Sequence, residues 1–194
     1  MYDNLYSLVD INPENVHYLN PNATDLKEEC DRFERLISDL GGLDLAFFGT
    51  GADGHVARNE PGSSLKSSTR MTRLAYDTRL QLSQRWSRPI SLVPTAALTV
   101  GMSTIFEAGQ VLVLFTGVLR AHALSSCLEG SVSHMYPVSA LQKHKDCCYA
   151  ADDDATFELK VKTVSYFKGI EKTSKEVFGD GIHGRGRKRK NIQL

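Results

Sequence analysis

The chain has 194 residues, 41% of them hydrophobic, which suits one globular domain with a buried core. Its 23 basic residues balance its 23 acidic residues, so no overall charge favours nucleic acid or a membrane surface as a partner. No apolar run approaches the roughly 20 residues that span a bilayer, and the first residues lack a signal-peptide pattern. We therefore expect a cytoplasmic protein with no nucleic-acid or membrane partner.

The first regular element that the pattern predicts is a helix over residues 24–40. Its apolar residues recur at helical spacing, Thr24 suits the N-cap position, and a Gly-Gly pair follows its last turn. The run Leu43–Phe48 comes next and is apolar except for Asp44. A nearly continuous apolar run predicts a strand buried on both faces, which is typical of a parallel sheet.

The same alternation of strand and helix continues along the chain. An apolar run at 111–115 leads into a predicted helix over 120–128, and a shorter strand at 147–150 precedes a predicted helix over 156–168. This order predicts the α/β class, as a Rossmann-like three-layer sandwich with a mostly parallel sheet. These elements form one expected domain over 1–169.

Residues 170–194 differ in composition from this domain. Their last part is rich in glycine and basic residues and has few apolar side chains to pack, so we expect a disordered tail. A nuclear-import or nucleic-acid patch is the alternative interpretation of its basic run. The four cysteines show no Cys-x-x-Cys spacing, so we expect reduced thiols and no metal site.

The most informative segment directly follows the first predicted strand. Residues 49–55 read Gly-Thr-Gly-Ala-Asp-Gly-His, and Glu60 lies five residues further on. A histidine can give and take a proton near neutral pH, and a nearby carboxylate orients its ring and stabilises the charged form. Asp53, His55 and Glu60 therefore predict an acid–base site at the carboxyl end of the sheet, where ligands bind in α/β folds.

This loop has two other interpretations. In the purely structural one, Asp53 makes a turn, Glu60 caps the next helix and His55 is a surface residue; the preceding apolar strand and the dense glycines favour a function instead. The spacing of Gly49, Gly51 and Gly54 also fits a dinucleotide-binding pattern, but no ribose-binding acidic residue follows at the right distance. We therefore expect no nucleotide cofactor.

Residues 51–64 resemble the signature of the glucosamine-6-phosphate deaminase family: Gly-Ala-Asp-Gly-His-Val-Ala-Arg-Asn-Glu-Pro-Gly-Ser-Ser. The resemblance continues in order and covers nearly everything from Tyr2 to about Gly169. The further segments that carry it are 68–70, 93–101, 134–135, 138–142 and 159–167.

The resemblance implies a reaction and roles for the site residues. Members of this family convert glucosamine 6-phosphate and water into fructose 6-phosphate and ammonia in amino-sugar catabolism, without a metal or an organic cofactor. By resemblance, His55 helps to open the sugar ring, and Asp53 and Glu60 orient the His55 side chain and tune its acid–base behaviour.

The resemblance also implies a phosphate site. Arg120 stands where the family has a phosphate-binding lysine, and an arginine keeps the charge and can bind phosphate oxygens in pairs. The alternative is that Arg120 is a solvated residue at a helix start. A second arginine of the family matches the position of Gln84 in this chain. Arg85, the next residue, would bind the phosphate in its place only after a local shift of the chain.

Bacterial relatives have an allosteric site for N-acetylglucosamine 6-phosphate between the subunits of a hexamer. Ser63, Arg70 and Tyr166 match positions of that site, whereas Thr72 replaces an expected lysine. By resemblance we expect a homo-oligomer with this effector. The simpler interpretations are a turn residue for Ser63 and core packing for Tyr166.

The family's first βα portion has no counterpart here, so we expect it to be missing, together with its phosphate loop and proton-transferring aspartate. Its absence would expose apolar faces of the strands at 43–48 and 111–115. Arg58 also stands where relatives have an aromatic residue. These departures predict a chain with reduced or no turnover of substrate.

Two alternative functions remain. One is a non-catalytic family member that acts as an interaction or regulatory subunit. The other is a 6-phosphogluconolactonase-like hydrolase, which shares a Gly-x-Asp-Gly-His loop, although Asn59-Glu60-Pro61 replaces the segment expected after that loop.

Overall fold

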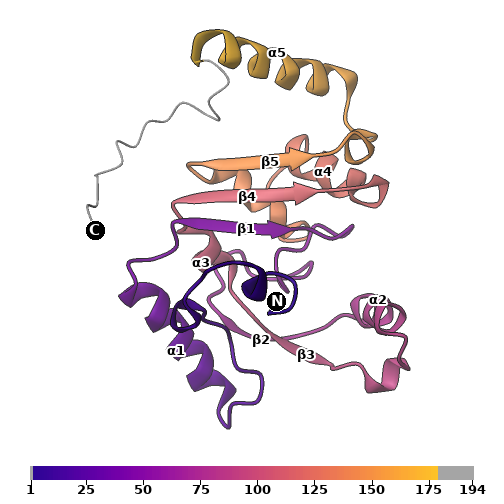
Figure 1. The fold of residues 1–194 in the computed structure, drawn as a ribbon. Coiled ribbons are helices and arrows are strands. Elements are labelled where there is room, and N and C mark those ends of the chain that lie inside the picture. Colours follow the sequence, from indigo (N-terminus) through magenta and orange to yellow (C-terminus); the bar gives the residue numbers. More distant parts are fainter. Residues whose placement is uncertain (1, 179–194) are drawn as a thin grey trace, which may run out of the picture.

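A parallel sheet forms the centre of the molecule (Figure 1). The computed structural model describes residues 2–178. The sheet contains β1 (Leu45–Gly49), β4 (Gln110–Phe115) and β5 (Cys147–Ala151), in the order β1-β4-β5. Both strand pairs are parallel, which confirms the predicted α/β class and its parallel sheet.

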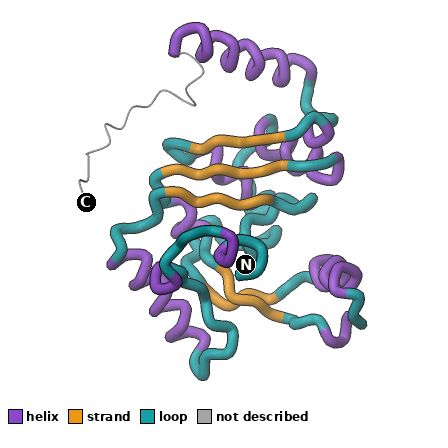
Figure 2. Tube along the Cα trace, in the orientation of Figure 1, coloured by secondary structure: helices purple, strands orange, loops and turns teal. Residues whose placement is uncertain are grey.

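A second, smaller sheet was not predicted from the sequence. The strands β2 (Arg70–Arg73) and β3 (Ala96–Thr99) pair antiparallel and lie on the β1 side of the main sheet in Figure 1. The connection between them contains α2 (Tyr76–Trp86), and α3 (Met102–Phe106) follows β3. Figure 2 shows how much of this half of the molecule is loop.

The helix predicted over 24–40 is present as α1 (Leu26–Asp39). Its N-cap is Asp25 and not the predicted Thr24, because the Asp25 Oδ1 atom accepts hydrogen bonds from the backbone N–H groups of Lys27 (2.8 Å) and Glu28 (3.0 Å). A carboxylate at this position also interacts favourably with the positive, N-terminal end of the helix dipole.

The predicted helix over 120–128 is α4 (Ala121–Leu128), preceded by a 3-10 turn at Val118–Arg120. The helix predicted over 156–168 is wrong at both ends, since a 3-10 turn covers Asp154–Thr156 and α5 runs over Val161–Phe178.

The side chain of Glu129 explains where α5 begins. It accepts hydrogen bonds from the Lys160 N–H (2.9 Å) and the Thr163 hydroxyl (2.5 Å). Gly169 does not end the helix, which continues past the domain boundary expected at 169. The basic run of the predicted tail lies in residues 179–194, outside the described residues.

The hydrophobic core lies on one face of the main sheet. The side chains of Val111, Val113 and Phe115 point to this face and are fully buried. On the opposite face of β1, Leu45 and Phe47 are 53% and 60% exposed, so the expected burial on both faces is wrong for this strand. The expected exposure of an apolar face is confirmed for β1 but is wrong for β4, where Leu112 and Leu114 are half-buried and the other apolar residues are buried.

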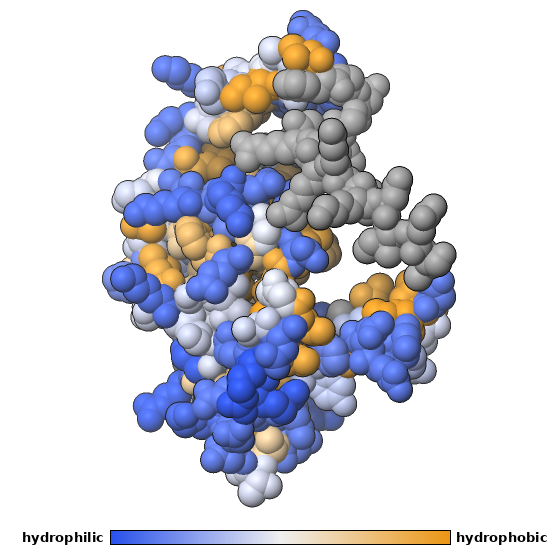
Figure 3. Space-filling view, turned by 90° about the vertical axis from the view of Figure 1, so that its left-hand side faces the viewer, coloured by the Kyte–Doolittle hydropathy of each residue, from blue (hydrophilic) through white to orange (hydrophobic). Residues whose placement is uncertain are grey.

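The surface on the side of α1 is mostly hydrophilic in its lower part, where α1 lies, and hydrophobic patches appear higher up (Figure 3). No described helix is both long and apolar enough to cross a bilayer.

Candidate active site

The predicted site loop follows β1 and folds back on itself. Thr50 and Val56 form an isolated antiparallel bridge, and Val56 forms another with Asn59. The Thr50 hydroxyl donates a hydrogen bond to the His55 carbonyl oxygen (2.7 Å). These contacts fix the base of the loop, next to the carboxyl end of β1.

Asp53 and His55 are in direct contact. The Asp53 Oδ1 atom lies 2.7 Å from His55 Nδ1 and also accepts a longer hydrogen bond from the His55 N–H (3.4 Å). Because a carboxylate only accepts, Nδ1 has the hydrogen in this contact. The other ring nitrogen, Nε2, is then the one left for a ligand, and the His55 side chain is 21% exposed.

The electrostatics of this pair keep Asp53 ionised. Partial burial acts to raise the pKa of the Asp53 carboxyl, but the hydrogen bond and charge interaction with His55, with further backbone hydrogen bonds, outweigh it and lower the pKa below its usual value. The site therefore presents an imidazole backed by a negative charge.

Two glycines make room for this arrangement. A Cβ atom on Gly51 would overlap His55 Cε1 and lie only 2.5 Å from its Nδ1. Gly54 has a φ of +73°, and a Cβ there would lie 3.0 Å from Cδ1 of Tyr136. The first glycine lets the ring lie against the loop backbone, and the second lets a distant aromatic side chain pack on the loop.

The segment 133–138 forms a second wall against the loop. The Val138 N–H donates to the Gly54 carbonyl oxygen (3.0 Å), and the Gly62 N–H donates to the His134 carbonyl oxygen (2.9 Å). Tyr136 lies between these two anchor points in sequence. Sequence reasoning did not assign it a role, since no spacing pattern links it to a loop so far away in the chain.

Glu60 is buried but is not bonded to His55. Its Oε2 atom accepts a hydrogen bond from the Ala75 N–H (2.7 Å), immediately before α2, and its buried Oε1 atom has no protein partner among the described residues. The structure brings Asp53 and His55 together, while Glu60 contacts the connection to α2.

Arg120 lies at the start of α4, beyond the carboxyl end of β4. Because β1 and β4 are parallel neighbours, Arg120 and the site loop lie at the same edge of the sheet. No described residue bonds to its guanidinium, whereas the nearby Gly117 N–H donates to both carboxylate oxygens of Asp152 (3.0 and 2.9 Å).

Arg85 lies in the last turn of α2 and is exposed, as is Gln84. In Figure 1, α2 stands well apart from the carboxyl ends of the main sheet. The structure therefore does not bring Arg85 to the other predicted phosphate-binding residue.

The three predicted effector residues do not meet within one chain. Ser63 lies on the site loop, where its N–H donates to the Glu60 carbonyl oxygen (3.0 Å). Arg70 begins β2, bonds to Asn59 Oδ1 (2.7 Å), and has a pKa lowered by burial. Tyr166 lies on α5, 64% exposed, on the other side of the main sheet (Figure 1).

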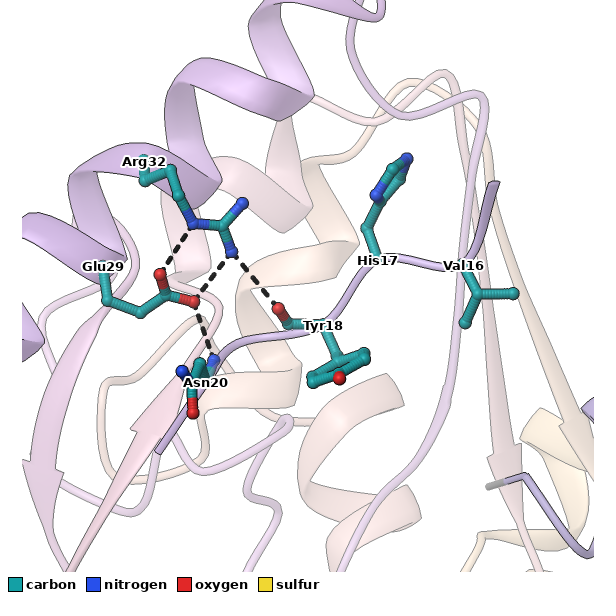
Figure 4. A pocket seen from close by; sticks show the side chains of 6 residues that line it. All are labelled: Val16, His17, Tyr18, Asn20, Glu29 and Arg32. Carbon is teal, nitrogen blue, oxygen red and sulfur yellow. Dashed lines mark hydrogen bonds and ion pairs between the residues drawn. The ribbon is translucent and has the colours of Figure 1, made fainter. Parts of the chain in front are cut away.

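A shallow hollow lies away from this site, between α1 and the N-terminal segment (Figure 4). There the side chains of Glu29 and Arg32 face each other, and Arg32 also reaches the Tyr18 carbonyl oxygen. None of the predicted site residues lines it. Among the described residues, no group of three or more metal-binding side chains is placed to hold a metal ion.

Comparisons with known proteins agree with the sequence resemblance. Glucosamine-6-phosphate deaminase 2 of Bos taurus is 50% identical over 170 residues, which are 88% of this chain and 62% of the relative. Glucosamine-6-phosphate deaminase 1 of Homo sapiens is 49% identical over 170 residues, 88% of this chain and 59% of the relative. The chain thus spans about three fifths of the length of these curated relatives.

Solved structures share the fold. A monomeric glucosamine-6-phosphate deaminase superposes with a TM-score of 0.78 at 38% identity, over 81% of this chain and 65% of that one. A 6-phosphogluconolactonase from Thermotoga maritima gives 0.55 at 22% identity, over 78% of this chain and 62% of that one, a likeness of fold alone.

The family model described as glucosamine-6-phosphate isomerases/6-phosphogluconolactonase matches residues 1–149, which contain the whole site loop and the strands β1, β2, β3 and β4. With this match and the identity to deaminases over most of its length, the chain belongs to the glucosamine-6-phosphate isomerase and 6-phosphogluconolactonase family.

Proposed function

We propose that the site acts in the isomerising deamination of glucosamine 6-phosphate to fructose 6-phosphate and ammonia. The observation that supports this most is the Asp53–His55 pair, 2.7 Å apart, in a chain that is 50% identical to a glucosamine-6-phosphate deaminase over 170 residues. The reaction would belong to amino-sugar catabolism in the cytoplasm.

In this proposal His55 acts on the ring oxygen of the sugar. An imidazolium held at Nδ1 by Asp53 can donate its Nε2 hydrogen to that oxygen as the bond from C1 to the ring oxygen breaks. The neutral imidazole can then take up the proton that the C1 hydroxyl loses as the aldehyde forms. Asp53 keeps the ring oriented and stabilises its charged form, for which its lowered pKa suits it.

Arg120 would bind the phosphate group of the sugar. Its guanidinium is unbonded among the described residues and lies at the same edge of the sheet as His55. Because Asp152 already occupies the Gly117 N–H, the phosphate contact would fall to the arginine side chain. Glu60 would act indirectly on the site, through its hydrogen bond to the Ala75 N–H before α2. Arg85 lies in the last turn of α2 and would reach the phosphate only if this helix moved.

An effector site would need a second copy of the chain, because Tyr166, on α5, lies far from Ser63 and Arg70, which bond to the adjacent residues Glu60 and Asn59. We propose such a homo-oligomeric site for N-acetylglucosamine 6-phosphate, by resemblance to the bacterial relatives. Analytical ultracentrifugation with and without this sugar phosphate tests it, and a chain that stays monomeric with unchanged sedimentation would contradict it.

A two-substrate experiment tests the function itself. The purified chain is given glucosamine 6-phosphate in one assay and 6-phosphogluconolactone in another, and ammonia and acid release are followed. Ammonia release alone supports the deaminase. Lactone hydrolysis without ammonia would identify the lactonase alternative, and a folded chain with neither activity would support the non-catalytic one. Arg120→Ala is expected to raise KM for whichever of the two substrates the chain turns over, because it removes the proposed phosphate contact.

A further inference from the structure

A chain of three side chains lies beside the candidate site and is not used by the proposed reaction. His122, on α4, places its Nε2 atom 2.9 Å from the Tyr136 hydroxyl and its Nδ1 atom 2.9 Å from Glu158 Oε2. The rings of His122 and Tyr136 also meet edge to face, with their centroids 5.7 Å apart. The three residues come from three separate segments of the chain.

The direction of these hydrogen bonds follows from the donors and acceptors. Because the Glu158 carboxylate only accepts, His122 Nδ1 has the hydrogen, and Nε2 of the neutral ring then accepts the Tyr136 hydroxyl hydrogen. Glu158 thus fixes the His122 ring, and His122 in turn fixes the Tyr136 hydroxyl.

Tyr136 connects this chain of contacts to the acid–base pair. Its ring packs against Gly54, the residue between Asp53 and His55, so closely that a Cβ there would lie 3.0 Å from the ring. The Val138 N–H holds the Gly54 carbonyl oxygen from the same segment. A shift of Tyr136 therefore shifts the backbone from which the His55 ring projects.

His122 also lies two residues after Arg120, at the start of the same helix. The contact between His122 and Tyr136 thus joins the segment with the proposed phosphate-binding arginine to the loop with the acid–base histidine. A sugar phosphate must reach both groups at once, and a misplacement of about 1 Å at a site can reduce the rate on the order of 10²-fold.

We propose that His122 is a positioning residue: held by Glu158, it sets through Tyr136 the placement of the His55 loop relative to the Arg120 end of α4. The proposal rests on the proposed function for its effect on turnover. The His122 and Glu158 side chains are 60% and 52% exposed, and exposed pairs contribute little to stability. Their removal should therefore leave the fold intact.

The test uses the full chain, four single variants and the double variant His122→Ala/Tyr136→Phe. His122→Ala removes both contacts, Tyr136→Phe retains an aromatic ring but removes the hydroxyl that His122 holds, and His122→Gln retains one donor and one acceptor. His17→Ala removes an exposed histidine elsewhere and serves as the control. Thermal unfolding first confirms that each variant is folded. If His122→Ala is unfolded, Tyr136→Phe alone tests the positioning role.

With glucosamine 6-phosphate, His122→Ala and Tyr136→Phe are each expected to lower kcat about tenfold or more with little change in KM, since the phosphate still binds while the ring is misaligned. The double variant should lose no more activity than the less active of the two single variants, because both single variants remove the same contact between His122 and Tyr136. His122→Gln should recover most of the activity. Additive losses, or a His122→Ala that behaves like His17→Ala, would overturn the proposal.

A second readout separates this proposal from the proposed function. If the unmodified chain releases no ammonia, the function fails, and the imidazole ¹⁵N signals of His55 decide the positioning role. His122→Ala and Tyr136→Phe are expected to displace these signals, whereas His17→Ala leaves them in place. Signals that stay unchanged in both site variants would refute the role of His122.

Discussion

The acid–base pair depends on a residue that has no side chain. The His55 ring lies against the backbone of Gly51, where a Cβ would overlap it. The sequence predicted that a carboxylate of this tight loop, Asp53 or Glu60, would lie against His55, and the structure places Asp53 there. The sequence did not predict that Glu60 bonds Ala75, since that partner depends on the tertiary path of the chain to α2.

Gly51→Ala is expected to displace the His55 ring and break its 2.7 Å contact with Asp53. Ammonia release and the His55 ¹⁵N signals measure the effect, and we expect at least a tenfold loss of activity. Gly49→Ala is the control, because a Cβ there meets only Leu114 O at 3.8 Å. Equal behaviour of the two variants would contradict the role of Gly51.

Glu29 makes a pH-dependent contribution to stability. Its carboxylate accepts hydrogen bonds from Arg32 (2.7 and 2.8 Å) and from the Asn20 N–H (2.7 Å), as Figure 4 shows. The hydrogen bond from Arg32, followed by that from Asn20, lowers its pKa from 4.5 to about 2. A lowered pKa stabilises the fold above the unfolded value, and this stabilisation is lost as the pH falls through the folded one.

Glu29→Gln should therefore unfold more easily at pH 7, and its stability should change less than that of the unmodified chain between about pH 4.5 and pH 2. Urea unfolding across this range measures it. Glu28→Gln is the matched control, since the Glu28 side chain is exposed and forms its ion pair with Arg35, which is itself exposed. A parallel pH dependence in Glu29→Gln and the unmodified chain would disprove the account.

At the scale of elements, the three strands of the main sheet were predictable because long apolar runs have few alternatives in a domain of this size. The strands β2 and β3 were missed because they are four residues each and partly polar, and their pairing is non-local. The start of α5 was also missed, because it depends on the Glu129 side chain from another segment.

The N-cap of α1 gives a direct test at this scale. Asp25→Ala removes the acceptor for two backbone N–H groups and should destabilise the chain by about 1 kcal/mol. Thr24→Ala should change the free energy of unfolding by less than about 0.5 kcal/mol. Chemical denaturation of both variants measures this, and a larger effect at Thr24 would restore the N-cap expected from the sequence.

At the scale of the whole molecule, the core occupies one face of the sheet and the apolar face of β1 remains exposed. Phe115 is fully buried, so Phe115→Ala should lower the free energy of unfolding by about 3–5 kcal/mol. Phe47 is 60% exposed, and Phe47→Ala should change it by less than about 0.5 kcal/mol. Denaturation at several protein concentrations measures both, and a concentration-dependent loss in Phe47→Ala would show that this face is covered in solution.

The central claim is that the Asp53–His55 pair performs acid–base chemistry on glucosamine 6-phosphate. The measurement that tests it most directly is ammonia release by the purified chain and by His55→Ala, with fructose 6-phosphate quantified alongside. The account predicts equal amounts of both products, reduced about 10²–10⁴-fold in the variant. A folded chain that releases no ammonia, or a variant as active as the unmodified chain, would contradict it.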